Sequence, residues 1–415
     1  MAYSDTARAY YDGELKTISS AGLFKHERYI HAPQGAEIEV EFPEGSPPRK
    51  VINMCANNYL GLSSHAEVVA AAHGGLGARG YGMSSVRFIC GTQDIHRELE
   101  NRLTAFLGTE DTMLFSSCFD ANGGVFEALL NDQDAVISDR LVHASIIDGL
   151  RLCKARREIF EHSDMAQLEE VLRRHADQRF RMIVTDGVFS MDGDLARLDA
   201  IVALAERYDA RVVVDDSHAA GVGGKTGRGT HEQCGVVGKI DIITTTLGKA
   251  LGGASGGCVS GRRELVAMCR QRARPYLFSN TLAPVVVSGT LAVMDLVTRS
   301  TALRDKLEAN TRFWRKGLTD AGFDLKPGDS PIVPVMLYNA RLSQDVSRDL
   351  FDEGVYAVGF FYPVVPKAQA RIRTQLSAAH DPHHLEQALQ AFIKVGQKHG
   401  ILGLKQDEII ARFGE

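Results

Sequence analysis

One lysine of this chain stands where an amine could do covalent chemistry. Lys249 follows the apolar run 242–247 and lies among glycines in the segment GKALGG. An amine that is withdrawn from water loses part of its proton affinity and becomes a nucleophile toward aldehydes. Lys249 is therefore a candidate to bond an aldehyde cofactor, although its spacing alone fits an ordinary surface lysine in a glycine loop equally well.

A carboxylate ends another apolar run. Val212 to Val214 are followed directly by Asp215, Asp216, Ser217 and His218. In a doubly wound sheet the ligand lies beyond the carboxyl ends of the strands. Pyridoxal 5′-phosphate (PLP) acts as an electron sink when its ring nitrogen stays protonated, and a buried carboxylate keeps it so. Asp215 alone could equally cap a helix, so it is the pair with Lys249 that indicates PLP.

A phosphate group also needs a binding site. Residues 114–124 lie between a predicted strand and a predicted helix, where free backbone N–H groups can hold an anion. The Walker pattern is absent, and the glycine-rich segment 221–229 does not fit G-x-G-x-x-G, so nucleotide binding is the weaker interpretation. His143 follows another predicted strand; it could stack on a planar ring, or it could cap a helix or pack in the core.

The elements that must position these residues alternate along the chain. Short β-branched runs and longer amphipathic stretches between about residues 60 and 295 predict a parallel sheet covered by helices. The predicted strands are 112–116, 135–138, 182–185, 212–214 and 240–245, and the clearest predicted helices are 165–175 and 198–208. After about residue 295 a helical stretch to residue 321 precedes strands 332–337 and 370–376 and helices 343–352 and 385–399. We therefore expect an N-terminal segment (1–60), a large α/β domain (61–295) and a small α+β domain (296–415).

Composition narrows the class of protein. The chain has 415 residues, 44% of them hydrophobic and 24% charged, and a formal net charge of -5, so it carries no strongly basic field that would indicate nucleic acid or an anionic membrane. The apolar runs are too short for a membrane span, and the acidic start lacks the apolar region of a secretion signal. Seven cysteines without a Cys-x-x-Cys pair suit a reducing compartment, so we expect a cytoplasmic protein. No metal site is expected, and His383 and His384 are interpreted as a solvated helix start.

Several blocks of the chain, in order, resemble the α-oxoamine synthases of PLP fold type I. The resemblance covers nearly the whole chain and rests on CANNYLGL (55–62), SVRFICGT (85–92), and residues 116–124, 186–193, 215–218, 246–257, 274–280 and 359–379. The blocks SVRFICGTQD, SSCFDANGG and GFFYPVVPK are most similar to the members that join glycine to acetyl-coenzyme A. The resemblance implies a large domain with a mostly parallel seven-stranded sheet, a small α+β C-terminal domain and PLP as the cofactor.

The family also implies a role for each matching residue. Lys249 would bond the cofactor, Asp215 would pair with the ring nitrogen, His218 would bind the ring hydroxyl, and His143 would stack over the ring with Ser190 nearby. The phosphate would be bound by Thr246, the amides of Cys118 and Phe119, and Ser279 and Asn280 from the other subunit of a homodimer with shared active sites. Asn57 and Arg373 would hold the glycine carboxylate. Arg371 faces the same way as Arg373 on the predicted strand, and only the motif match favours Arg373.

The expected reaction is the reversible condensation of glycine with acetyl-coenzyme A to 2-amino-3-oxobutanoate, and Lys249 would remove the Cα proton while His143 helps to polarise the thioester. Whether the physiological direction is synthesis or thiolysis of this threonine-derived ketone stays open. Two alternatives remain: a related synthase that uses alanine, serine or a longer acyl group, and a non-catalytic protein of the same fold. The tail after Gly400 is longer than the family pattern, and a solvated or interface-packing end is the default expectation.

Overall fold

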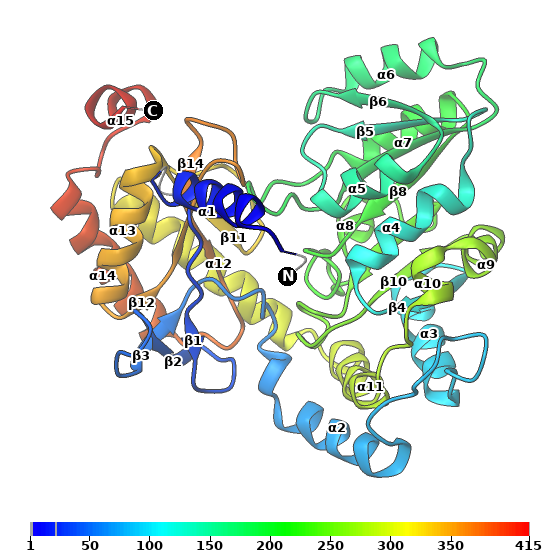
Figure 1. The fold of residues 1–415 in the computed structure, drawn as a ribbon, viewed down its shortest axis with the longest axis horizontal. Helices are drawn as coiled ribbons and strands as arrows, with labels where there is room; N and C mark the ends of the chain where they lie inside the picture. The colour runs from blue at the N-terminus through cyan, green and yellow to red at the C-terminus, as the bar shows by residue number, and fades with distance from the viewer. Residues whose placement is uncertain (1–2, 21–22, 415) are drawn as a thin grey trace.

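A seven-stranded sheet forms the centre of the larger part of the molecule. The computed structural model describes residues 3–20 and 23–414, and its central sheet has the order β4-β10-β9-β8-β7-β5-β6 (Figure 1). The strands are β4 (Asp111–Phe115), β5 (Ala135–Asp139), β6 (Arg156–Phe160), β7 (Arg181–Asp186), β8 (Ala210–Asp215), β9 (Ile242–Thr246) and β10 (Gly257–Gly261). All neighbouring pairs from β9 to β6 are parallel, and β10 is antiparallel to both of its neighbours. The mostly parallel seven-stranded sheet is thus confirmed.

Helices cover this sheet, as the buried character of its strands requires. Every residue of β5 and β7 is buried, which is typical of parallel strands packed on both faces. The helices of this part are α3 (Asp94–Leu107), α4 (Cys118–Leu129), α5 (Ala144–Leu152), α6 (Met165–Arg174), α7 (Leu198–Arg207), α8 (Thr230–Gln233), α9 (Arg263–Arg272) and α10 (Arg274–Phe278). Below them in Figure 1, α2 (Ala66–Arg79) packs against α11 (Pro284–Arg299).

The C-terminal part contains a smaller antiparallel sheet of order β11-β14-β13. Its strands are β11 (Ile332–Tyr338), β13 (Val358–Phe360) and β14 (Ala370–Gln375), and its helices are α12 (Ala302–Asp320), α13 (Ala340–Asp352) and α14 (Pro382–His399). The buried indole of Trp314 on α12 donates a hydrogen bond to Thr374 Oγ1 on β14 at 2.9 Å. This bond and the surrounding apolar core fix the strand on which Arg371 and Arg373 stand.

Strands from both halves of the sequence form a third sheet, β1-β2-β3-β12. It consists of β1 (Tyr29–Ile30), β2 (Glu37–Glu41), β3 (Arg49–Asn53) and β12 (Val355–Tyr356). The parallel pairing of β12 with β3 joins residues about 300 positions apart in the chain. The short helix η1 (Leu62–Ser64) then leads from this sheet to α2.

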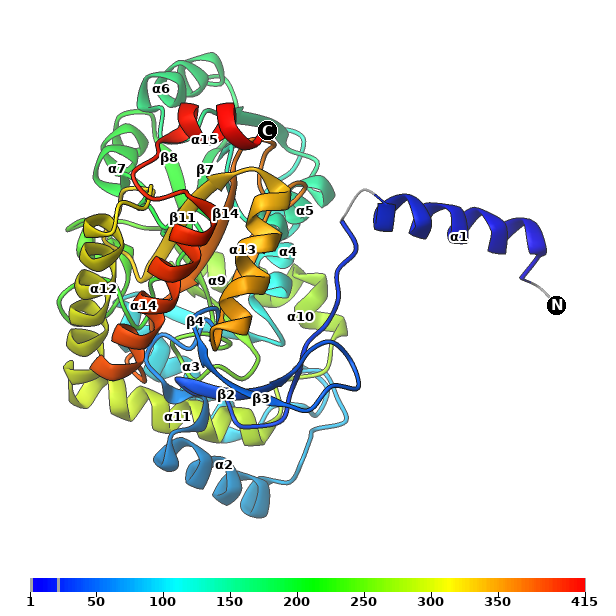
Figure 2. The same cartoon turned by 90° about the vertical axis from the view of Figure 1, so that its left-hand side faces the viewer.

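The two terminal helices differ in how they pack. Helix α1 (Asp5–Ser20) buries none of its residues and stands away from the rest of the molecule in Figure 2. Helix α15 (Gln406–Phe413) lies against β11, with Ile409 only 1% exposed and Arg412 donating to the Gly400 carbonyl at 2.7 Å. One side of the tail after Gly400 is therefore packed on its own chain, and the other side is exposed.

Within the described residues, no single helix has both the length and the apolar character that a membrane crossing requires. One bent pair, α11 followed by α12 at 76°, meets the length and composition test together. Both helices contribute buried side chains to the main apolar core, among them Val287, Val293 and Trp314.

Candidate active site

A cavity of about 220 Å³ opens at the carboxyl ends of the central parallel strands. Asp186 ends β7, Asp215 ends β8, and Lys249 lies just beyond β9. The cavity is lined by Ser117, Cys118, Phe119, His143, Ser145, Asp186, Val188, Asp215, Ser217, His218, Thr246 and Lys249. Lys249 and Asp215 therefore face one common space, as a single cofactor in contact with both would require.

The Asp215 carboxylate is held by fixed donors. Asn122 Nδ2 donates to Asp215 Oδ2 at 2.6 Å, and the backbone N–H of Ser217 donates to Oδ1 at 3.0 Å. Asn122 is oriented in turn by Ser145 Oγ at 2.9 Å and by Thr244 Oγ1, which donates to its oxygen at 2.8 Å. These donors fix the carboxylate at the wall of the cavity, where it can pair with the ring nitrogen of a bound cofactor.

The amine of Lys249 is connected to a buried histidine and a buried tyrosine. Its Nζ lies 2.9 Å from Nε2 of His218, whose Nδ1 lies 2.8 Å from the hydroxyl of Tyr59. Burial lowers the pKa of Lys249 below its usual range, although the charge of Asp215 opposes this effect. Burial and the neighbouring Lys249 also hold the pKa of His218 well below its usual range, so the imidazole is neutral. A lysine with a depressed pKa is a better nucleophile at neutral pH.

The start of α4 fits a phosphate group. Ser117 caps this helix by accepting a hydrogen bond from the Asp120 N–H at 3.0 Å, and the first intrahelical bond runs from Ala121 N to the Ser117 carbonyl. The amides of Cys118 and Phe119 precede that bond at the positive end of the helix dipole. Thr246 lines the same cavity.

His143 both lines the cavity and caps α5. Its ring Nδ1 accepts from the backbone N–H of Ser145 at 3.2 Å and lies 2.7 Å from Ser145 Oγ. The backbone N–H of His143 donates to Asp186 Oδ1 at 3.1 Å. Burial, together with the charge of Asp215, raises the pKa of Asp186 well above its usual value. The two interpretations of His143, as a cap and as a wall of the cofactor site, are compatible in this geometry.

The two arginines of β14 have different partners. Arg371 is 2% exposed and is bound by the Asp192 carboxylate and, at 2.9 Å, by the Met191 carbonyl. Arg373 donates to the Ser190 carbonyl at 2.8 Å and lies over the Phe360 ring at 4.6 Å. No carboxylate of the described residues pairs with Arg373 in an ion pair. Arg373 is thus available for a carboxylate ligand, whereas Arg371 is already neutralised.

Four predicted residues and Arg373 lie outside the cavity lining. The Ser190 carbonyl accepts a hydrogen bond from Arg373. Asn57 contacts the side-chain amide of Gln375, which also contacts Arg373. Ser279 and Asn280 follow α10 and contact the end of β4, where Ser116 Oγ donates to the Asn280 carbonyl at 2.9 Å. In one chain these last two residues do not face the cavity, so the part predicted for them in the other subunit stays a prediction.

Four residues of the site, Tyr59, Asn122, Ser145 and Gln375, received no role from the sequence, and Asp186 appeared only within the block 186–193. Asn122 and Ser145 lie one helical turn or less from predicted site residues, which is the signal that could have identified them. Tyr59 lies within the CANNYLGL block, but its contact with His218 spans 159 residues. Gln375 follows Arg373 on the same strand at the spacing that shares one face.

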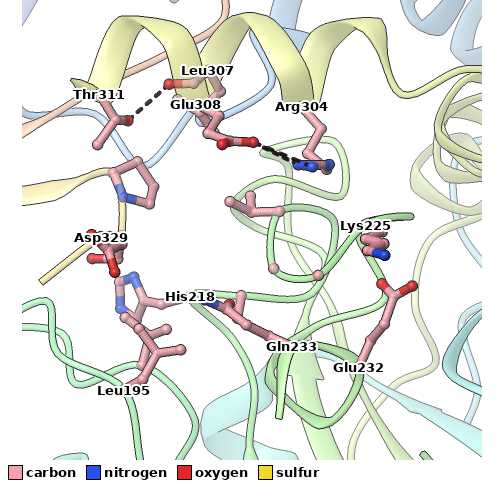
Figure 3. A pocket seen from close by; sticks show the side chains of 17 residues that line it. Leu195, His218, Lys225, Glu232, Gln233, Arg304, Leu307, Glu308, Thr311 and Asp329 are labelled. Carbon is pink, nitrogen blue, oxygen red and sulfur yellow. Dashed lines mark hydrogen bonds and ion pairs between the residues drawn. The ribbon is translucent and has the colours of Figure 1, made fainter. Parts of the chain in front are cut away.

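A second cavity, of about 400 Å³, shares His218 and Val188 with the first. It lies between α8 and the loop before it on one side and α12 on the other (Figure 3). Arg304 and Glu308, which lie on this α12 wall, form an ion pair at 3.0 Å. His218 is thus bordered by space on two sides, at the junction between the large sheet and the C-terminal helices.

One group of side chains elsewhere has the composition of a metal site. Donor atoms of Asp381, His383 and His384 lie within 4.8 Å of one another. Asp381 is already bound by Lys306 Nζ at 2.6 Å, and His384 Nδ1 accepts from the Asp381 N–H at 3.0 Å in a capping box at the start of α14. These contacts are those of a helix start.

Residues 270–274 include three arginines, of which Arg270 is bound inside the chain. Arg270 and the buried Arg87 both bind Glu100, at 3.3 and 2.9 Å, and Glu100 also accepts from the Leu114 N–H. This ion group ties α9 and the loop that contains Arg87 to β4. Arg270 is therefore used internally and is not free to bind a coenzyme phosphate.

Comparison with known proteins agrees with this geometry. Residues 49–392 match the family described as aminotransferase class I and II. The chain is 55% identical to 2-amino-3-ketobutyrate coenzyme A ligase of Escherichia coli K12, over 94% of this chain and 97% of that protein. It is 50% identical to the mitochondrial 2-amino-3-ketobutyrate coenzyme A ligase of Bos taurus, over 95% and 93% of the two chains.

Among solved structures, serine palmitoyltransferase from S. paucimobilis with PLP and myriocin bound is similar in fold. It has a TM-score of 0.89 and 29% identity, and the match covers 95% of this chain and 99% of that one. The expected PLP-dependent fold is therefore confirmed. From its sequence matches and its architecture together, the chain belongs to the 2-amino-3-ketobutyrate coenzyme A ligases, within the aminotransferase class I and II family.

Proposed function

We propose that the protein is a PLP-dependent glycine C-acetyltransferase, which condenses glycine with acetyl-coenzyme A to give 2-amino-3-oxobutanoate and coenzyme A, reversibly. The observation that carries this proposal is the shared cavity of Lys249, Asp215 and His218, in a chain that is 55% identical to a ligase of that name. A chain that only used the fold as a scaffold would have no need of all three groups.

The residues that line the cavity fit the cofactor at each of its polar ends. Asp215 would pair with the ring nitrogen, His218 with the ring hydroxyl, and Lys249 with the aldehyde carbon. Thr246 and the amides of Cys118 and Phe119 would bind the phosphate, and His143 would cover the ring. When bound, PLP supplies a ring that accepts electron density from the substrate Cα.

The remaining steps fall to side chains of this protein. Arg373 and Asn57 would bind the glycine carboxylate, and a two-point hydrogen-bonded clamp fixes which Cα bond stands perpendicular to the ring plane. The amine of Lys249, once it is displaced by the substrate amine, would accept the Cα proton, a contribution of about 10²- to 10⁴-fold to the rate. Holding the carboxylate in this clamp would separate this reaction from that of a decarboxylating relative.

We also propose that the enzyme is a homodimer in which Ser279 and Asn280 complete the phosphate site of the partner subunit. Apolar side chains near the cavity mouth support this: Phe88, Ile89, Phe119 and Phe278 are 50–68% exposed in the single chain. The segments that bear them are linked to one another by the Thr281–Ser85 backbone bond and the Ser116–Asn280 bond. Exposed apolar clusters of this kind are typical of protein interfaces. We propose a cytoplasmic location as well, because the seven free thiols suit a reducing compartment.

A substrate panel tests the proposal. The purified enzyme, loaded with PLP, is offered glycine, alanine or serine with acetyl-, propionyl- and palmitoyl-coenzyme A, and released thiol is measured. Glycine with acetyl-coenzyme A is expected to give the highest kcat/KM. Serine with the palmitoyl thioester as the best pair would instead assign the activity of the structurally similar palmitoyltransferase.

Lys249→Ala is the matched control for this panel. The variant is expected to lose thiol release, and a chain that keeps near wild-type turnover without Lys249 would contradict its assigned role. The absence of turnover with every pair, in a wild-type sample that binds PLP, would favour the non-catalytic alternative.

A further inference from the structure

Buried polar side chains form a continuous hydrogen-bonded chain from Arg373 to Lys249. Gln375 lies two residues after Arg373 on β14, and its amide oxygen accepts from Arg373 Nη2 at 2.5 Å and from Nε at 3.0 Å. A guanidinium can only donate hydrogen bonds, so the oxygen of the amide must face it. The amide nitrogen then has two acceptors, one for each of its hydrogens: Asn57 Oδ1 at 2.5 Å and the hydroxyl of Tyr59 at 3.1 Å.

The direction of this first bond sets the direction of the next two. Because the Tyr59 oxygen accepts from Gln375, its hydrogen is free to be donated to Nδ1 of His218, 2.8 Å away. A neutral imidazole has a single ring proton, so an accepting Nδ1 places that proton on Nε2. Nε2–H then points at the Lys249 nitrogen at 2.9 Å. A free amine can accept this bond through its lone pair, whereas an ammonium ion has none.

Water has little access to this chain and cannot easily replace its members. Tyr59, Gln375, His218 and Arg373 are 0%, 1%, 7% and 7% exposed. A buried polar group that loses its partner costs about 1 to 3 kcal/mol, which strongly favours the arrangement in which every donor has an acceptor. That arrangement is the one with the ring proton on Nε2.

We propose that Tyr59 and Gln375 are positioning residues that fix the tautomer of His218 and thereby hold Lys249 as a free amine. The inference concerns this chain's own hydrogen bonds, and rests on the proposed function only for the use made of the amine. It links the residue expected to bind the substrate carboxylate, Arg373, to the residue expected to move the Cα proton.

Some groups around Lys249 favour its ammonium form, and others favour its free amine. Asp215, Cys118 and Asp186 favour the ammonium form of Lys249, and Arg373 disfavours it. Around His218 the facing groups are Lys249, Arg373 and His143, all of which disfavour an imidazolium. Burial has the largest effect and disfavours the ammonium form of Lys249, against the opposing charge of Asp215. A fixed donor aimed at the nitrogen acts in the same direction as burial, because it binds the lone pair.

The first test locates the ring proton directly. The full-length chain, labelled with ¹⁵N-histidine, is examined by NMR before and after addition of PLP, and the His218 signals are assigned by their loss in His218→Asn. We expect an unprotonated Nδ1 and a protonated Nε2 in both states. A proton on Nδ1 of His218 would overturn the proposal, whatever reaction the enzyme catalyses.

The second test measures the reactivity of the amine. In Tyr59→Phe the donor to Nδ1 is lost, the ring proton can move to that nitrogen, and Nε2 can accept from an ammonium. The pH midpoint for capture of PLP by the cofactor-free chain is expected to rise by about 1 unit, so that capture below both midpoints is about tenfold slower. Gln375→Leu is expected to move the midpoint in the same direction by a smaller amount.

The matched control is Tyr338→Phe. It also removes a buried tyrosine hydroxyl, which donates to Asp324 at 2.6 Å, but it leaves the chain to Lys249 intact. Its midpoint is expected to equal that of the wild type. A folded Tyr59→Phe variant with an unchanged midpoint would overturn the proposal; if that variant does not fold, the tautomer measured in the wild-type chain decides alone.

Discussion

Two arginines on one strand illustrate how neighbouring residues divide their tasks. Arg371 and Arg373 point to the same side of β14, but Asp192 binds the first and leaves the second without a carboxylate partner. The sequence leaves the choice between them open, and a loop residue 179 positions from Arg371 favours Arg373. The two arginines share an orientation, and Arg373 is favoured as the substrate ligand because it has no carboxylate partner within the described chain.

Arg373→Ala is expected to raise the KM for glycine by about 100-fold, the loss of roughly 3 kcal/mol from a charge-assisted clamp. The KM for acetyl-coenzyme A should change by less than about threefold, because the thioester carries no group for this arginine. Steady-state kinetics with each substrate varied in turn would measure both values. Equal changes in the two KM values would indicate a structural role instead.

Arg371→Ala is the control on the same strand. It removes a buried guanidinium and leaves the half-buried Asp192 with only the 3.8 Å contact to Lys326, so it is expected to lower the free energy of unfolding by about 3 kcal/mol. The ratio of the two KM values should stay near that of the wild type in the protein that remains folded.

Asn122 is expected to act on the cofactor through Asp215. Asn122→Ala removes a 2.6 Å donor from the carboxylate, which weakens its ionised form by about 1.5 kcal/mol and raises the Kd for PLP about tenfold. Titration of the cofactor-free chain with PLP, followed by absorbance, measures this. Asn310→Ala removes another buried asparagine, bonded to the Ser377 and His380 carbonyls, and should leave the affinity for PLP unchanged.

The positions of Lys249, Asp215 and His218 could be predicted because each follows an apolar strand, and strand ends meet at one edge of a parallel sheet. Tyr59, Asn122 and Gln375 could not be assigned in this way. Spacing places Asn122 near Cys118 and Gln375 near Arg373, but their roles depend on hydrogen-bond directions and on contacts between segments far apart in the chain, which spacing does not record.

At the scale of elements, a half-buried histidine joins three loops beside the sheet. His162, just after β6, lies 3.1 Å from Asp139 at the end of β5 and 2.7 Å from Asp194 in the loop after β7. Burial opposes its charged form, but the hydrogen bonds to both carboxylates outweigh this and raise the pKa of His162 to about 10. The loop that ends at Asp194 also contains Ser190, so this contact supports the partner of Arg373.

The raised pKa predicts a pH-dependent stability. A histidine whose pKa is higher in the folded than in the unfolded chain stabilises fully below about 6.5 and loses this effect as the pH rises through about 10. His162→Gln is therefore expected to lower the free energy of unfolding by about 3 kcal/mol at pH 6. The difference from the wild type should shrink toward zero between pH 7 and pH 10.5, as urea unfolding at several pH values would show. A difference that is constant with pH would mean that His162 is uncharged.

Five predicted strands of the large sheet and both of its named helices were found within about two residues of their expected bounds. Strands β6 and β10 were missed, for different physical reasons. Strand β6 is an edge strand with the sequence RREIF, whose outward charges hide the apolar pattern. Strand β10, GCVSG, has a glycine at each end and is placed by its two antiparallel neighbours rather than by β propensity.

At the scale of the whole molecule, the apolar surface near the cavity predicts a dimer. Phe278→Asp is expected to shift the protein from dimer to monomer in sedimentation experiments, because a charge buried in an apolar interface costs several kcal/mol. Thiol release should fall in parallel, since Ser279 and Asn280 would no longer reach the partner's site. Ile159→Asp, on a 56% exposed residue of β6 at the opposite edge of the sheet from β4, should change neither. A monomeric Phe278→Asp enzyme with full activity would contradict the shared site.

The pairing of β3 with β12 has a consequence for the order in which the molecule is made. During synthesis, β3 is made about 300 residues before its parallel neighbour β12. All strands of the large sheet lie between residues 111 and 261, so this sheet can form while β3 still lacks that neighbour. Long-range pairing of this kind is slow and leaves strand edges exposed meanwhile. Nascent chains stalled near residue 300 should therefore hold a protease-resistant centre flanked by an unfolded leader, and these are the chains that would need a chaperone.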